Sequence, residues 1–408
     1  VGSEMCIRDR PGPMRIFVLN SGSSSIKYSI FDMHNETRLF SVKIELDGKP
    51  GSISLSRRQK TPGVIDQHIE SPPVTDHASG LLQIIELLQD NEPDSENLFH
   101  AIGHRVVHGG ESFHLPVLID ETIIAAIRKM IPLAPLHNPV NLTGIEEMHR
   151  RFPNIVQVAV FDTAFFRTLP PRAYRYAVPD ELYREHHVRR YGFHGISHQY
   201  VSAEVASHLK QPLKSLRIIS VHLGNGASVA AIENGICIDT SMGMTPTEGL
   251  VMGTRCGDVD PSLHFYLTRS LGVNIDEIES LLNNDSGLKG LCGFHDMREV
   301  QQMSNEGDEH ARLAIDIYCY RACKYIGAYF TALGGLDVLA FTGGIGENDP
   351  VIRKTICDRL SVFGISLNEK QNISRKKSTF AISMESSKIK VLVVPANEEL
   401  EIARQTFS

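Results

Sequence analysis

Residues 217–232, RIISVHLGNGASVAAI, place two apolar runs on either side of a short glycine-rich turn. The first run ends with a polar histidine and a leucine before the glycines, and β-branched residues fill both flanks. This pattern is typical of a strand, a tight turn and a second strand. Residues 14–32 repeat it as MRIFVLN, SGSSS and IKYSIFD. One recurrence is a weak repeat signal, but it predicts two related halves that each present a hairpin turn to a common ligand.

Predicted strands and helices alternate along the rest of the chain, which favours an α/β fold. At 408 residues the chain exceeds what one hydrophobic core usually serves, so we expect two domains. The Pro- and Arg-rich run at 168–179 favours a boundary near residue 163. We expect extended segments at 42–55, 101–106, 336–341 and 391–395, a loop at 56–79, and helices at 81–88, 121–131, 308–333, after Asp349 and at the C-terminus.

The composition is that of an ordinary globular protein, with 42% hydrophobic and 22% charged residues. A formal net charge of −7 argues against a nucleic-acid binder, and no apolar run approaches the length of a membrane span. Seven cysteines without a CxxC pair make a poor disulfide or zinc framework. We therefore expect a cytoplasmic protein. Residues 1–13 lack a signal-peptide pattern, and we interpret them as a non-native or disordered leader.

Three glycine-rich segments follow predicted strands, at 22–25 (GSSS), 224–226 (GNG) and 343–348 (GGIGEN). Glycine lets the backbone approach closely and direct several N–H groups at one anion, which suits phosphate. A single segment of this kind is more often only a tight turn, but three at strand ends favour a phosphate site. None matches the P-loop or the dinucleotide fingerprint, and no protein-kinase catalytic loop is present.

Arg105 and Arg255 each lie in a short segment flanked by glycine, GHRVVHGG and GTRCGDVDP. Guanidinium groups bind carboxylate or phosphate through a planar fork of donors. A structural ion pair is the commoner role of an isolated arginine, but the neighbouring Gly, His and Asp residues favour a binding site.

Histidines and one aspartate supply further candidates. His104 and His108 are four residues apart in a strand-like segment, which disfavours a metal site. His137 and His194 lie in predicted loops, where a histidine is often only solvated but can donate to a developing anion. Asp162 ends an apolar run, a usual place for a catalytic or Mg²⁺-organising carboxylate and also for a helix N-cap.

Together these segments resemble the acetokinase family, whose propionate and butyrate kinases are close relatives. The resemblance extends from Met14 to the C-terminus. The segments that carry it are NSGSSSIK (20–27), GHRVVHGG (103–110), APLHNP (134–139), FDTAF (161–165), YGFHG (191–195), HLGNG (222–226), TSMGMTPTEGLVMGTRCGDVDP (240–261), FTGGIGEN (341–348) and NEE (397–399).

The resemblance implies two duplicated α/β domains of the actin/hexokinase (ribonuclease H-like) type around a nucleotide cleft. We expect a leader at 1–13, an acyl-substrate domain at 14–162 joined by 399–408, and a nucleotide-binding domain at 163–398. The family pattern also implies ATP and Mg²⁺ (Mn²⁺ as a substitute) as cofactors, acetate as substrate, and a homodimer.

Site roles follow from the resemblance, residue by residue. It places a metal at Asn20 and Glu398, and catalysis at Arg105, Asp162, His194 and Arg255. It places the acyl substrate at Arg105, Val107, Leu136, His137, Phe193 and Pro246. It places ATP at Lys27, His222, Leu223, Gly224, Asn225, Gly226, Asp296, Met297, Arg298, Gly344, Ile345, Gly346, Glu347 and Asn348.

Acetate is ionised at neutral pH, so its attack on ATP needs alignment and charge neutralisation rather than a general base. We therefore expect direct in-line transfer to acetyl phosphate, with Asp162 positioning Mg²⁺ or an arginine rather than moving a proton. Val107 follows Arg105 by two residues, so on a strand both would face one side, and Val107 would close a methyl pocket. The alternatives are a propionate or butyrate kinase, a sugar kinase, and a non-catalytic actin-like nucleotide-binding protein.

Overall fold

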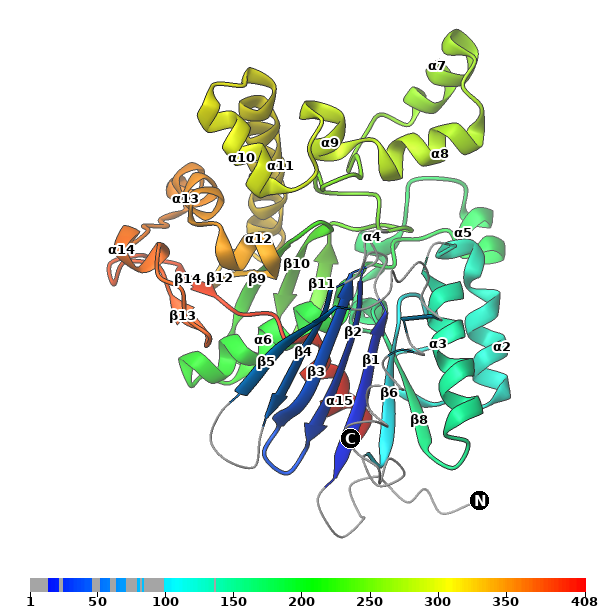
Figure 1. The fold of residues 1–408 in the computed structure, drawn as a ribbon. Coiled ribbons are helices and arrows are strands. Elements are labelled where there is room, and N and C mark those ends of the chain that lie inside the picture. The colour runs from blue at the N-terminus through cyan, green and yellow to red at the C-terminus, as the bar shows by residue number, and fades with distance from the viewer. Residues whose placement is uncertain are drawn as a thin grey trace. The chain divides into compact units, whose positions relative to one another are not determined.

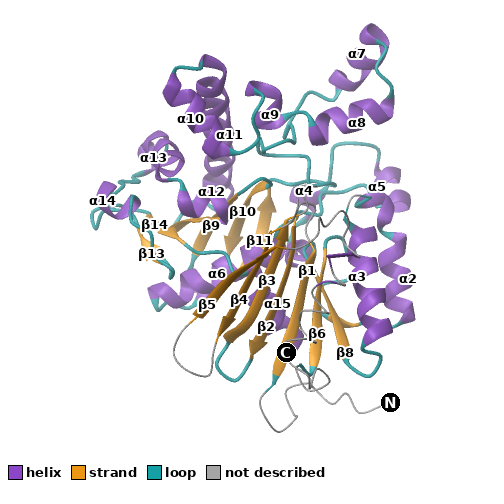
Figure 2. Cartoon of the chain, in the orientation of Figure 1, coloured by secondary structure: helices purple, strands orange, loops and turns teal. Residues whose placement is uncertain are grey.

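The computed structural model describes residues 14–21, 25–45, 52–58, 64–70, 79–80, 83, 99–135 and 137–408. The described chain divides into two compact units. Unit 1 is Val1–Ala164 with Asn397–Ser408, and unit 2 is Phe165–Ala396. These bounds lie within two residues of the division expected from the sequence. Figure 2 colours the helices, strands and loops of both units.

Unit 1 is built on an eight-stranded sheet of order β5-β4-β3-β2-β1-β6-β8-β7. β1 pairs antiparallel with β2 and parallel with β6, and β6 pairs parallel with β8. Alternating apolar residues on β1 to β3 pack into one core, with Phe17, Tyr28 and Ile44 almost fully buried. The strands are β1 (Arg15–Ser21), β2 (Ser25–Asp32), β3 (Thr37–Glu45), β4 (Ser52–Arg58), β5 (Val64–Glu70), β6 (Ala101–Val106), β7 (Val117–Leu118) and β8 (Val156–Phe161).

Helices α2 (Glu121–Lys129), α3 (Asn138–Arg151) and α15 (Glu398–Phe407) complete unit 1. α15 is the last element of the chain, yet it packs against β1, β6 and β8 (Figure 1). Gly103 permits this approach, because a Cβ there would lie 2.3 Å from Oγ1 of Thr406. The sheet therefore holds the C-terminal half of α15 close to β6.

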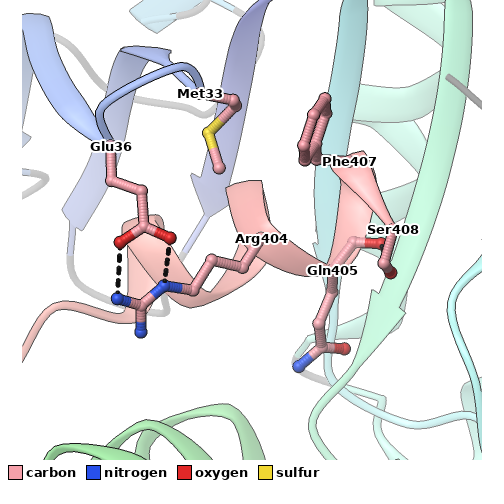
Figure 3. Close-up of a pocket in the computed structure, with 6 residues that line it drawn as sticks. All are labelled: Met33, Glu36, Arg404, Gln405, Phe407 and Ser408. Carbon is pink, nitrogen blue, oxygen red and sulfur yellow. Dashed lines mark hydrogen bonds and ion pairs between the residues drawn. The ribbon is translucent and has the colours of Figure 1, made fainter. Parts of the chain in front are cut away.

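An ion pair fastens the end of α15 to the turn between β2 and β3. Nε and Nη2 of Arg404 donate to the two carboxylate oxygens of Glu36 at 2.9 and 2.6 Å. The pair lies beside Met33 and Phe407 on the rim of a surface pocket (Figure 3). The hydrogen bond from Arg404 lowers the pKa of Glu36.

Unit 2 repeats the strand arrangement of unit 1. Its six-stranded sheet has the order β11-β10-β9-β12-β14-β13. β9 pairs antiparallel with β10 and parallel with β12, and β12 pairs parallel with β14. The strands are β9 (Arg217–Leu223), β10 (Ala227–Glu233), β11 (Ile236–Thr240), β12 (Val338–Thr342), β13 (Phe380–Ala381) and β14 (Lys390–Val393). The strand order and directions match those of β3-β2-β1-β6-β8-β7 in unit 1. The sheet of unit 2 has no counterpart of β4 and β5.

Helices from several parts of the chain pack on this second sheet (Figure 1). α6 contacts β9 and β12, α11 contacts β9 and β10, and α12 contacts β9 and β12. The helices of unit 2 are α4 (Pro171–Tyr174), α5 (Asp180–His186), α6 (Gly195–Leu209), α7 (Ser262–Leu271), α8 (Ile275–Asn284), α9 (Gly287–Cys292), α10 (Met297–Glu306), α11 (Glu309–Ala332), α12 (Gly343–Asn348), α13 (Pro350–Arg359) and α14 (Glu369–Asn372).

Most expected elements are confirmed, including both hairpins, the long helix α11 and the C-terminal strand and helix. The expected N-cap Asp120 accepts a hydrogen bond from the amide of Ile123 at 2.8 Å. The loop expected at 56–79 is wrong, because β4 continues to Arg58 and β5 spans Val64–Glu70. Antiparallel strands tolerate polar residues on a face that meets water, so the polar sequence misled the prediction.

Two other expectations need comment. The segment GGIGEN is a short helix, α12, rather than a turn, and its first residue, Gly343, has a positive φ of 80°. The helix expected at 81–88 and most of the GSSS turn lie outside the described residues. In the part of the chain that the structure describes, no helix combines the length and the apolarity that a bilayer span requires.

Candidate active site

In unit 1, three predicted site residues lie where parallel strands end at one edge of the sheet. Asn20 is near the end of β1, Arg105 is near the end of β6, and Asp162 follows β8 directly. Because β1, β6 and β8 run parallel, their carboxyl ends meet at the same edge, the usual position of a ligand site in an α/β sheet. The strand order thus explains why residues 20, 105 and 162 come together.

Arg105 is the centre of this cluster. Its Nε and Nη2 donate to Oδ2 of Asp162 at 3.1 and 2.5 Å, and its Nη1 donates to Oδ1 of Asn20 at 3.0 Å. The side chain of Arg105 is 14% exposed and that of Asp162 is 2% exposed. Burial alone would lower the pKa of Arg105, but the carboxylates of Asp162, Glu398 and Glu399 hold it above its ordinary value. The guanidinium is therefore a fixed cation with one edge toward Asp162.

A pair of carboxylates lies on the other side of Asn20. Its Nδ2 is 3.4 Å from Oε2 of Glu398 and 3.4 Å from Oε1 of Glu399. Both glutamates come from the first turn of α15. Lys27, opposite Asn20 on β2, places Nζ 3.9 Å from Glu399. Arg38 donates to the other Glu399 oxygen at 3.2 Å. The cluster thus alternates cations and carboxylates around one amide.

The predicted acyl-binding residues of unit 1 are placed less completely. Val107 lies one residue beyond the end of β6, so strand alternation does not by itself align it with Arg105. It is 4% exposed, and its amide donates to Oδ1 of Asn141 at 3.0 Å. His137 is the N-cap residue of α3. Leu136 lies outside the described residues.

The histidines at 104 and 108 are buried structural residues. Nε2 of His104 lies 2.7 Å from Oε1 of Gln157, and Nδ1 of His108 accepts from the amide of Gly110. Burial lowers the pKa of each to about 4. The described residues contain no group of three or more His, Cys, Asp or Glu side chains arranged to hold a metal ion.

In unit 2, two predicted nucleotide segments lie at adjacent strand ends. His222 on β9 is opposite Thr342 on β12, and both strands run in the same direction. The amide of Gly224 donates to the carbonyl of Gly226 at 3.0 Å, which closes the turn. A Cβ on Gly343 would lie 2.6 Å from the carbonyl oxygen of Leu223, so these two backbones touch. A Cβ on Gly344 would meet no atom within 4 Å, so the backbone there faces open space.

His194 and His222 form a stacked pair, with ring centroids 4.4 Å apart and an interplanar angle of 22°. His194 has a positive φ of 60° at the residue that precedes α6. A Cβ built on Gly226 would lie 3.3 Å from Nε2 of His194 and 3.6 Å from Nη1 of Arg255. The glycine turn, His194 and Arg255 therefore surround one point.

Arg255 differs from Arg105 in its partners. Its Nη1 donates to the carbonyl of Pro246 at 3.3 Å, and among the described residues no carboxylate forms an ion pair with it. Burial lowers the pKa of Arg255. A desolvated guanidinium without a carboxylate is suited to bind an anion that arrives with the substrate.

The other predicted residues of unit 2 lie at the start of α10, in α12 and in the core. Asp296 caps α10 through the amide of Arg298 and pairs with its guanidinium. The loop before it approaches the glycine turn, because a Cβ on Gly253 would lie 3.1 Å from the carbonyl of His295 and 2.0 Å from Oδ1 of Asn225. Glu347 accepts the amide of Ala396 at 2.9 Å. Phe193 is 2% exposed and belongs to the core.

The sequence did not single out several residues that the structure brings to these sites. Glu399 touches Asn20, Lys27 and Arg38, and its place in the acidic run after Asn397 was the available signal. His198 and Ser228 contact each other and support His194, but they are 30 residues apart and no pattern links them.

The repeated mixed sheet, with site residues at the ends of its parallel strands, defines the chain as a two-domain protein of the actin/hexokinase (ribonuclease H-like) class. The model of the acetokinase family matches residues 15–404. The acetate kinase of Syntrophobacter fumaroxidans is 48% identical over 396 residues, covering 97% of this chain and 96% of the relative. That of Desulfotalea psychrophila is 49% identical over 399 residues, covering 96% and 98%.

Solved structures agree with these sequence matches. Porphyromonas gingivalis acetate kinase superposes with a TM-score of 0.85 at 42% identity, covering 96% of this chain and 98% of that chain. A propionate kinase from Francisella tularensis superposes with a TM-score of 0.86 at 40% identity and the same coverage. The chain belongs to the acetokinase family, which confirms the resemblance inferred from its motifs.

Proposed function

We propose that this protein is an ATP-dependent acetate kinase, which transfers the γ-phosphoryl group of ATP to acetate and gives acetyl phosphate and ADP reversibly. Membership of the acetokinase family supports a phosphotransferase with a carboxyl acceptor. The observation that carries the proposal is the state of Arg105. Its partners hold it rigidly but leave open the part of the guanidinium that a carboxylate needs.

A guanidinium has five N–H donors. Arg105 uses three of them, one each from Nε, Nη1 and Nη2. Among the described residues Arg105 makes no other hydrogen bond, so one N–H remains on Nη1 and one on Nη2, and in this proposal that pair binds the carboxylate in a bidentate manner. In this proposal acetate binds there, and Asp162 orients the guanidinium instead of moving a proton. An acetate ion needs no deprotonation before it attacks, so the site requires no general base to generate the nucleophile.

In this proposal, residues of unit 2 bind the phosphoryl group. The backbone at Gly344 and the turn at Gly224–Gly226 offer close approach to the phosphates, as do the following residues up to Asn348. His194 and Arg255 donate to the equatorial oxygens, where charge is spread in a loose transition state. Within unit 2, the Asp296–Arg298 segment supplies further nucleotide contacts in this proposal. Direct in-line displacement then inverts the configuration at a chiral γ-phosphorus, and net retention would contradict it.

A magnesium ion fits the carboxylate pair of unit 1. Mg²⁺ usually binds one or two protein carboxylates together with phosphate oxygens and waters. Glu398 and Glu399 supply two such carboxylates, both within 3.4 Å of the Asn20 amide. Because Oδ1 of Asn20 already accepts from Arg105, Asn20 orients the glutamates from the outer shell of the ion. When bound, Mg²⁺ neutralises charge on the phosphates; Mn²⁺ has the same preference for oxygen ligands.

The acyl chain length is the second element of the proposal. In this proposal Val107, which is buried in unit 1, limits the space for the methyl group of acetate. The similarity to a propionate kinase at 40% identity makes propionate the main alternative substrate. A pocket of this kind discriminates against one methylene by only about 1–3 kcal/mol, so acetate preference is expected to be incomplete.

A hydroxamate assay with formate, acetate, propionate and butyrate tests the function directly. Acetate should give the highest kcat/KM. A higher value for propionate would change the substrate assignment, and ADP release that no acid stimulates would favour a non-catalytic nucleotide-binding protein.

A homodimer is the expected assembly. None of the ten residues of α7 is buried. Its apolar residues Phe265, Tyr266 and Leu271 are each more than half exposed. Exposed apolar helices of this kind are typical of subunit interfaces. Sedimentation at micromolar concentration tests it, and a monomer would contradict it.

A further inference from the structure

Buried hydroxyl and imidazole groups form a continuous chain of hydrogen bonds behind His194. Oγ of Ser220 lies 2.8 Å from Nδ1 of His198, and Nε2 of His198 lies 2.8 Å from Oγ of Ser228. Oγ of Ser228 in turn lies 2.9 Å from Nδ1 of His194. Ser220, His198 and Ser228 are all fully buried. Four residues from β9, β10 and α6 thus make three consecutive bonds that end at one ring nitrogen.

The direction of donation in this chain is fixed by its inner end. The Ser220 hydroxyl has no other acceptor among the described residues, so its proton is satisfied only if it donates to Nδ1 of His198. The opposite direction would bury an unsatisfied donor, which costs about 1–3 kcal/mol. With Nδ1 as acceptor, neutral His198 carries its proton on Nε2 and donates to Ser228. Ser228 must then donate to Nδ1 of His194.

His198 is well suited to stay neutral. Burial, and then the charge of His222, lower the pKa of His198 well below its ordinary value. A neutral imidazole has one donor and one acceptor, so the hydroxyl at each end must play opposite roles. The donor role of Ser220 therefore fixes the donor in each following hydrogen bond, up to the bond from Ser228 to His194.

We propose that Ser228, oriented by His198 and Ser220, is a positioning residue that holds His194 neutral with its proton on Nε2. The inference rests on the proposed function, in which His194 donates to the transferring phosphoryl group. Nε2 and Cε1 are the ring atoms of His194 nearest the Gly226 turn, each 3.3 Å from a Cβ built on Gly226, and Nη1 of Arg255 lies 3.6 Å from the same point. His194 thus presents an N–H donor at this point before any substrate arrives, at no cost in reorientation.

The groups around His194 agree with a neutral ring. His222 from β9 stacks on it, His198 of its own helix lies behind Ser228, and the Arg255 guanidinium approaches the same glycine turn. Of these three, Arg255 carries a positive charge, and a like charge nearby disfavours an imidazolium. Protonation would also place an N–H on Nδ1 against Ser228, leaving the Ser228 hydroxyl without an acceptor in this chain.

Histidine-labelled protein and two-bond ¹H–¹⁵N correlation spectra test the proposal without substrate. The His194 signals are assigned from their loss in His194→Asn. At pH 7.5 wild type should show only Nε2 protonated. Ser228→Ala should show a mixture of both tautomers and a kcat lower by roughly 2- to 13-fold, the value of one neutral hydrogen bond, with KM for ATP little changed. Ser202→Ala removes a buried hydroxyl from α6 that lies outside this chain of hydrogen bonds, and it should match wild type.

A wild-type His194 that is protonated on Nδ1, or on both nitrogens at pH 7.5, would overturn the proposal whatever the variants do. An unchanged tautomer in folded Ser228→Ala would overturn it as well. The spectra do not depend on turnover. If the hydroxamate assay detects no acyl phosphate, the proposed function fails while the tautomer assignment is still decided by the spectra.

Discussion

The two glycines at the start of α12 give the sharpest test of where the nucleotide binds. Gly343 has a positive φ and touches the β9 backbone, whereas Gly344 follows it with helical geometry and open space at its Cα. An alanine at each position adds the same methyl group one residue apart. The pair therefore separates a structural requirement for glycine from a functional one.

The structure gives the expected magnitudes. In Gly343→Ala the methyl would lie 2.6 Å from the Leu223 carbonyl oxygen and 3.0 Å from its carbon, both backbone atoms that cannot move aside. Left-handed backbone costs an alanine about 1–2 kcal/mol, and overpacking adds about 1–3 kcal/mol. Gly344→Ala meets nothing within 4 Å, and helix propensity makes it neutral or stabilising by up to about 1 kcal/mol.

For ATP binding, the informative variant is Gly344→Ala, which should stay folded but bind ATP more weakly. A methyl at residue 344 keeps a phosphate from the backbone, and the loss of one charge-assisted bond, about 1.5–3 kcal/mol, raises KM for ATP roughly 10- to 150-fold. Denaturant unfolding measures stability, and a coupled ADP assay measures KM for ATP and for acetate. A folded Gly344→Ala protein with wild-type KM for ATP would refute the placement of ATP at α12. A stable Gly343→Ala protein would refute the steric argument.

Three further outcomes are expected. Arg105→Lys should lower kcat/KM for acetate roughly 10- to 150-fold, because an ammonium cannot keep both Asp162 bonds and a bidentate carboxylate. The control Arg128→Lys, at an exposed ion pair, should leave kcat/KM unchanged. Equal effects of the two substitutions would remove Arg105 from the site. His104 has a pKa of about 4 when folded, so the unfolded state takes up its proton first and stability falls as pH drops from about 6.5 to about 4; His104→Gln should flatten this loss in denaturant titrations. Val107→Ala should improve the propionate-to-acetate ratio of kcat/KM about tenfold, and an unchanged ratio would show that Val107 does not limit the pocket.

The fold could be predicted from the sequence wherever local pattern and tertiary role agree. Both hairpins have β-branched flanks and glycine turns, and α11 is a long amphipathic segment with Asp308 as its N-cap. The β4–β5 hairpin failed this criterion because its sequence is polar. These segments are strands because they pair with neighbouring strands and not because of their residue types. Such pairing cannot be recognised from a short stretch of sequence.

Candidate site residues could be proposed from the sequence, but their contacts with one another could not. Motifs drew attention to Arg105, Asp162, His194 and Arg255 because glycine and charged residues cluster around them. They could not show that Asp162 occupies one edge of Arg105 and leaves the outer N–H pair open. They also could not reveal the Ser220–His198–Ser228 chain, since buried Ser and His residues are unremarkable in sequence and become informative only when hydrogen-bond partners are known.

The two halves share a topology but place different chemistry on equivalent strand ends. The end of β6 carries Arg105, whereas β12, its counterpart, runs into Gly343 and Gly344. A charged side chain at that position binds a small anion through its own donors, while glycines remove the side chain and offer the backbone to a larger phosphate. Duplication thus supplies two similar sheet edges, and in the proposed function the residue types at their strand ends assign the acyl group to the edge with Arg105 and the nucleotide to the edge with Gly343 and Gly344.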